Sequence, residues 1–180
     1  EERLRERLAR ERPGEPVLGE EGGGEDASGW ILDPIDGTRN YTRGIPIWAT
    51  LIAFADRVAV VSAPALGRRW WAVRGDGAFA DGRPIQVSAI DRLEDATVLH
   101  ALDRPLPARA FDAWHLRGPG DFWAHMLVAE GAAEIAIDAR GLAVWDTAAV
   151  AVIVEEAGGR FTEHISSNSA LHEEALALAR

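Results

Sequence analysis

The sequence contains no cysteine, which excludes disulfide frameworks, thiolate zinc sites and cysteine nucleophiles. It also contains no lysine, because all 19 basic residues are arginine. That absence excludes Schiff-base chemistry, attachment of pyridoxal phosphate and the lysine of a phosphate-binding P-loop. No G-x-S-x-G nucleophile elbow occurs either. The groups that remain available for catalysis are carboxylates, a few histidines and bound metals.

Long apolar runs and an excess of positive charge are also missing. No run approaches the roughly 18 residues of a membrane span, and no signal peptide is recognised at the start. The net charge of −10 disfavours a nucleic-acid-binding surface and suits a site for divalent cations. We therefore expect a cytoplasmic protein that has neither nucleic-acid nor membrane partners.

The 180 residues are enough for a single domain, residues 1–180, with a sizeable core. Helices and strands are mixed without strict alternation, so we expect an α+β fold. Turn-forming glycines at 75, 77 and 82 predict an antiparallel meander over residues 68–88. The other expected elements are strands at 30–32, 45–55, 57–64 and 133–138 and helices at 1–10, 107–116, 120–133, 145–159 and 171–180.

Two carboxylates follow the apolar strand at 30–32. Asp33 and Asp36 are three residues apart around a turn that Pro34 stiffens, so both can point to one spot. The turn also leaves the carbonyl of Ile35 available as an oxygen ligand. Mg²⁺ prefers such oxygen ligands. The alternative interpretation is that Asp36 caps a helix and Asp33 is a turn acid.

Gly37 and Thr38 come next and are expected to open a helix. The first N–H groups of a helix have no intrahelical partner and can bind an anion. This loop therefore predicts metal ligands and a phosphate cradle side by side.

Two further acids stand at the ends of predicted elements. Glu20 ends a short strand upstream, and Asp146 begins an apolar helix directly after Trp145. Taken alone, Glu20 is a solvated loop acid and Asp146 is a helix cap. A buried helix with an acid at its start is also a way to direct a carboxylate into a site.

The segments GEE, WILDPIDGT and WDTAAVAVIVEEAGG, in this order and spacing, resemble the three signatures of the inositol-monophosphatase-like superfamily of magnesium-dependent phosphatases. The resemblance implies a layered αβαβα fold of mixed and antiparallel sheets, and direct attack of a water activated by two or three Mg²⁺ ions. It implies Glu20 and Thr38 as catalytic residues. It also implies metal ligation by Glu20, Asp33, the Ile35 carbonyl, Asp36 and Asp146, with phosphate held by Gly37 and Thr38.

The middle of the chain is more similar to the bacterial histidinol-phosphate phosphatase branch of that superfamily. Trp70-Trp71 and Gly120-Asp121-Phe122 carry most of this similarity. The implied reaction releases histidinol and phosphate in histidine biosynthesis. Asp121 and Asp138 lie near positions where the family contacts the leaving alcohol. A pair of acids there suits an amine-bearing substrate, because charge-assisted hydrogen bonds bind a cation.

Other interpretations stay open at this point. Within the family, an inositol-1-phosphate phosphatase or a related sugar or nucleotide phosphatase is the alternative. An aspartyl-nucleophile phosphatase needs acids two apart, so the three-residue spacing disfavours it. A non-enzymatic metal-binding domain is disfavoured by the complete ligand set. The resemblance also implies a homodimer, and further helices at the N-terminal side of this sequence.

Overall fold

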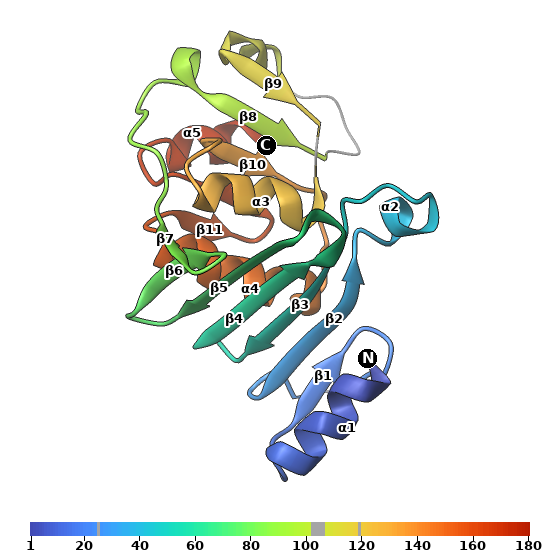
Figure 1. Cartoon of the computed structure of the whole chain (residues 1–180). Coiled ribbons are helices and arrows are strands. Elements are labelled where there is room, and N and C mark those ends of the chain that lie inside the picture. Colours follow the sequence, from blue (N-terminus) through green and yellow to red (C-terminus); the bar gives the residue numbers. More distant parts are fainter. Residues whose placement is uncertain (25, 102–106, 119) are drawn as a thin grey trace.

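The protein is described by a computed structural model that covers residues 1–24, 26–101, 107–118 and 120–180. Two β-sheets are stacked with the helices α3 (Asp121–Ala129) and α4 (Val144–Glu156) between them (Figure 1). Helix α5 (His172–Leu178) packs on the smaller sheet, and α1 (Glu2–Glu11) lies beside the first strand of the larger one. The layered α+β fold expected from the sequence is confirmed.

The larger sheet has seven strands whose spatial order follows the chain from β1 to β7. Only the pair β1–β2 is parallel, and the other neighbours are antiparallel. The predicted meander over residues 68–88 is therefore confirmed. The strands are β1 (Val17–Gly19), β2 (Trp30–Asp36), β3 (Ala49–Phe54), β4 (Val58–Ala63), β5 (Arg68–Val73), β6 (Gly77–Ala80) and β7 (Arg83–Ile85).

The smaller sheet has five strands in the order β11-β12-β10-β8-β9. They are β8 (Thr97–His100), β9 (His115–Arg117), β10 (Ile135–Ile137), β11 (Arg160–Thr162) and β12 (Ile165–Ser167). The helix predicted over 107–116 is wrong. A short 3₁₀ helix, Ala108–Asp112, occupies its first half, and β9 pairs in parallel with β8 in its second. Pairing with a neighbouring strand, which local sequence does not encode, decided the outcome.

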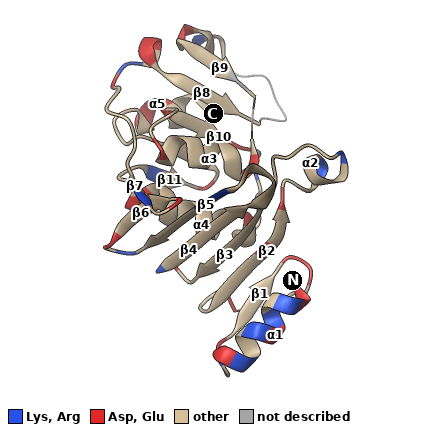
Figure 2. Cartoon of the chain, in the orientation of Figure 1, with Lys and Arg blue, Asp and Glu red and all other residues tan. Residues whose placement is uncertain are grey.

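Helix α4 supplies the centre of the core. Its residues Val150 and Ile153 pack with Leu51, Val61 and Trp70 of the larger sheet, and all five are essentially inaccessible to water. Each such aliphatic side chain contributes about 1.5–3 kcal/mol on burial. Figure 2 shows that the strands facing this helix carry little charge, whereas basic and acidic residues alternate along α1. This packing fixes the position of α4 against the larger sheet, and with it the position of the first turn of the helix.

Among the described residues, none of the helices has the length and hydropathy needed to cross a membrane.

Candidate active site

Asp33 and Asp36 lie within β2 rather than after it. The strand continues to Asp36, and its pairing with β3 shifts register between these two acids. The strand predicted at 30–32 was therefore too short. Pro34 sits at the irregularity, where its missing N–H costs no ladder hydrogen bond. An extra residue in a strand redirects the following side chains, which brings two acids three residues apart to one side of β2.

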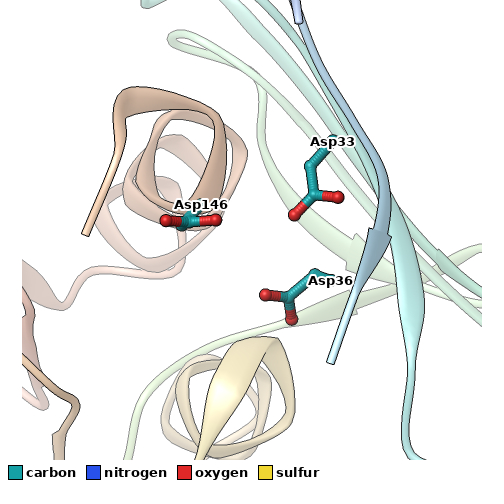
Figure 3. A group of neighbouring side chains, drawn as sticks. All are labelled: Asp33, Asp36 and Asp146. Atoms are coloured by element: carbon teal, nitrogen blue, oxygen red, sulfur yellow. The ribbon is translucent and has the colours of Figure 1, made fainter. Parts of the chain in front are cut away.

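Asp146 occupies the first turn of α4. Its Oδ2 accepts the N–H of Ala143 at 2.8 Å, so Asp146 helps to cap α4 from the third helical position, and Ala143 is the N-cap residue. The same carboxylate also faces Asp33 and Asp36 across a gap between helix and strand (Figure 3). One oxygen from each of the three acids lies within 4.8 Å of the others. Capping and site formation are thus two uses of one side chain.

The three carboxylates repel one another and are poorly solvated. Burial, followed by the charge of Glu20, raises the pKa of Asp33 to about 8. Burial also raises the pKa of Asp36 well above its usual range, and that of Asp146 to a smaller extent. Such a cluster is stable in its ionised form only when a cation neutralises it. A group of oxygen atoms at this spacing fits a hard divalent cation such as Mg²⁺.

Glu20 stands at the edge of this cluster. It follows β1, which pairs in parallel with β2, and its N–H donates to the carbonyl of Leu32 at 3.2 Å. Its side chain lines the same cavity of about 690 Å³ as Asp36 and Asp146. The structure therefore brings Glu20 to the site, although the tight three-acid group among the described residues does not include it.

Thr38 begins α2 (Thr38–Thr42), and Gly37 precedes it with φ +80°. A Cβ added to Gly37 would come within 2.9 Å of the Ile47 carbonyl oxygen, so both space and backbone angle require glycine. The Thr38 hydroxyl donates to the Ile35 carbonyl at 2.9 Å. Because a hydroxyl has one proton, its lone pairs are left to accept a hydrogen bond from another group.

Asp121 and Asp138, from two different elements, line the same cavity. Asp138 directly follows β10, and Asp121 begins α3 with the strained φ of +54°. Asn40 donates to Asp121 Oδ2 at 3.2 Å. Burial and the charge of Asp138 raise the pKa of Asp121, and Arg39 opposes them. Strain of this kind persists at functional sites because the surrounding structure over-determines it.

The pKa of Asp138 is shifted in the opposite direction. Burial raises it, but His125, the N–H of Ala139 and the N–H of Asp121 together lower it below its usual range. The side chain of Asp138 is therefore ionised at neutral pH. The neighbouring Phe122 N–H donates to Asp36 Oδ2 at 2.8 Å. The first turn of α3 thus donates one N–H to Asp138 and another to Asp36 of the three-acid cluster.

Sequence reasoning missed several residues that line this cavity, among them Arg39, Asn40 and His125. One of them, His125, is only 3% exposed. Its spacing of four residues from Asp121 places both on one face of a helix and was the available signal. Arg39 and Asn40 gave none, because their proximity to Asp121 depends on a contact between segments 81 residues apart.

Residues 1–179 match the sequence model described as the inositol monophosphatase family. The chain is 44% identical to the histidinol-phosphatase of Mycobacterium tuberculosis, over 96% of this chain and 78% of that protein. It is 41% identical to the histidinol-phosphatase of Streptomyces coelicolor, over 98% of this chain and 79% of that protein. Among solved structures, an IMPase from Thermotoga maritima superposes with a TM-score of 0.85 at 27% identity, over 98% of this chain and 78% of that one.

Proposed function

The chain belongs to the inositol monophosphatase family of metal-dependent phosphatases, and on that premise we propose that it hydrolyses histidinol phosphate to histidinol and phosphate. That it is a phosphatase acting on small phosphate esters follows from the family and from its histidinol-phosphatase relatives. The substrate is the proposal. A role in histidine biosynthesis, a cytoplasmic location, a homodimer and the absence of nucleic-acid or membrane partners stay predictions.

One observation carries the substrate proposal: a second pair of acids shares the cavity with Asp36 and Asp146 of the three-carboxylate cluster. Asp121 and Asp138 line that cavity but do not belong to the cluster. Histidinol phosphate has a phosphate at one end and an ammonium and an imidazole at the other. An anionic pair binds such a cationic end through charge-assisted hydrogen bonds. A neutral polyol carries no positive charge, so its binding does not require two carboxylates at this position.

The proposed metal is Mg²⁺, bound as two or three ions by Glu20, Asp33, the Ile35 carbonyl, Asp36 and Asp146. When bound, Mg²⁺ supplies charge neutralisation at the phosphate and lowers the pKa of a water molecule. The spacing and the raised pKa values of the three aspartates support this proposal, because ionised acids so close together need a cation.

The remaining roles belong to the chain itself. We assign the phosphate oxygens to the N–H groups of Gly37 and Thr38, which open α2. The Thr38 hydroxyl donates its proton to the Ile35 carbonyl. Its oxygen can therefore accept a hydrogen bond from the attacking water and orient that water. Glu20, at the cavity edge, takes the proton of that water as general base.

Phosphate release from histidinol phosphate and from inositol-1-phosphate, measured side by side with Mg²⁺, tests the proposal. We expect a higher kcat/KM for histidinol phosphate. A higher value for inositol-1-phosphate would assign the protein to the alternative activity within the family. Turnover of neither ester would contradict both assignments.

Asp121→Asn and Asp138→Asn should each lower kcat/KM for histidinol phosphate by roughly 10- to 150-fold. This range corresponds to losing a hydrogen bond to a charged group, about 1.5–3 kcal/mol. Asparagine suits the positive φ of Asp121, so the backbone is preserved.

Hydrolysis of glycerol phosphate, the phosphate ester of a small neutral alcohol, is the control for these two variants. It should change far less, because the three-acid cluster and the Gly37-Thr38 segment are untouched. Equal losses on both substrates would show that the two acids support structure or metal binding. No loss on either would remove them from the recognition site.

A further inference from the structure

His125 is a buried histidine that none of the roles above uses. It lies on α3, one turn after Asp121, and is 3% exposed. Its Nδ1 is 2.6 Å from the hydroxyl of Ser166, and its Nε2 is 3.6 Å from Asp138 Oδ2. Ser166 belongs to β12, which pairs with β10, the strand that Asp138 follows. The ring therefore connects a fixed strand to a carboxylate of the substrate cavity.

Both ring nitrogens of His125 are directed at protein groups rather than at the cavity space. An imidazole whose two nitrogens are both engaged has no further polar atom to offer a ligand. Its edge packs on Phe161, with ring centroids 5.7 Å apart. Direct contact with the reacting atoms is therefore not its role.

The orientation of the Asp138 carboxylate, in contrast, depends in part on His125. Its Oδ1 accepts the N–H of its neighbour Ala139 at 2.7 Å, and His125 faces Oδ2. A carboxylate with a partner at each oxygen is restricted in orientation, which is what selective binding of a cation requires. Without the imidazole, Asp138 would keep the N–H groups of Ala139 and Asp121 but lose the side chain that faces Oδ2.

We propose that His125 is a positioning residue for substrate selectivity, which fixes the Asp138 carboxylate toward the cationic end of the substrate while Ser166 fixes the imidazole. This inference rests on the proposed function, because it assigns Asp138 to recognition of the leaving alcohol. It adds a residue that acts through Asp138 and touches neither the phosphate nor the three-acid cluster.

Two substitutions separate the two ring nitrogens. In His125→Gln the amide nitrogen reaches the place of Nε2, so the contact with Asp138 is kept. In His125→Asn it reaches only the place of Nδ1, so the contact with Ser166 is kept and that with Asp138 is lost. We expect His125→Asn to raise KM for histidinol phosphate about tenfold with kcat within about twofold. His125→Gln should stay within about threefold of the wild type in KM.

His172 provides a matched control. It is also buried, with Nδ1 at 2.8 Å from Ser167 Oγ and Nε2 at 2.9 Å from Thr162 Oγ1. His172→Asn should lower thermal stability without changing the ratio of kcat/KM values for histidinol phosphate and glycerol phosphate. In the Asp138→Asn background, His125→Asn should cause no further rise in KM, because the residue acts through Asp138.

The two variants His125→Asn and His125→Gln could instead lose activity equally on both substrates, in proportion to their loss of thermal stability. That result would show that His125 only packs in the core, and it would overturn the proposal. An unchanged KM in His125→Asn would overturn it as well. A wild type that does not prefer histidinol phosphate contradicts the proposed function instead. Even then, carbon-13 NMR with Mg²⁺ present tests the positioning step, because the pKa of the Asp138 carboxyl should rise in His125→Asn and not in His125→Gln.

Discussion

Asp36→Asn should lower kcat by about a thousandfold or more, because a ligand of a catalytic cation contributes several kcal/mol of transition-state stabilisation. The amide oxygen can still accept the Phe122 N–H that Asp36 Oδ2 accepts at 2.8 Å, so the local fold should persist. The amide has no charged form, so it avoids the cost that burial and the neighbouring acids impose on an ionised Asp36, and it should even stabilise the metal-free protein. Steady-state kinetics with saturating Mg²⁺ and thermal unfolding in a chelator measure the two effects.

Asp95→Asn is the control for this variant, since it removes one negative charge from an exposed side chain with a weak ion pair to Arg92. It should leave both kinetics and stability close to those of the wild type. Near-normal turnover by Asp36→Asn at saturating Mg²⁺ would refute the assignment of the cluster as a metal site.

The metal-free protein should lose stability as the pH rises toward 8. The pKa of Asp33 is raised to about 8 from the ordinary value of 3.8, so the folded state keeps a proton that the unfolded state has released. A raised folded-state pKa gives stability that is present at low pH and is lost as pH climbs through the folded value. Between pH 6.5 and 8, Asp33 alone should cost about 1.6 kcal/mol, because it is already half ionised at pH 8. Asp36 and Asp146 are shifted in the same direction and add to it.

Urea unfolding in a chelator at several values from pH 6.5 to 8 measures this loss. The lower limit matters because burial lowers the pKa of His172, whose contribution has the opposite sign below about 6.5. Mg²⁺ at a hundred times its dissociation constant should restore about 2.7 kcal/mol at pH 8. Asp33→Asn should flatten the dependence. A metal-free wild type with equal or greater stability at pH 8 than at pH 6.5 would contradict the electrostatic account of the cluster.

The sequence could predict the parts of the site whose residues lie close together in the chain or within a recognisable signature. Asp33, Asp36, Gly37 and Thr38 are neighbours in the chain, and the order of the three signatures supplies Glu20 and Asp146. The fold class followed because the meander and the buried helix α4 have strong local patterns.

The parts that escaped prediction depend on contacts between distant segments. His125 and Ser166 are 41 residues apart, and nothing local indicates that β12 would present a hydroxyl to α3. The register shift in β2 depends on pairing with β3 rather than on the sequence of β2 alone. The strand β9 likewise exists because β8 is available as a neighbour. Tertiary pairing overrides local preference in each of these cases.

The first turn of α3 has a consequence for how this enzyme can change over evolution. Consecutive N–H groups of that turn serve Asp138 and Asp36, so one rigid peptide segment supports both the recognition acid and the cluster acid. A mutation that displaces the helix to admit a bulkier alcohol would disturb the chemistry at the same time. New substrate preferences can therefore arise more easily by exchanging side chains on an unmoved backbone than by remodelling it. Loops that do not contact this turn are free to vary in length, whereas insertions next to Gly120 should be strongly selected against.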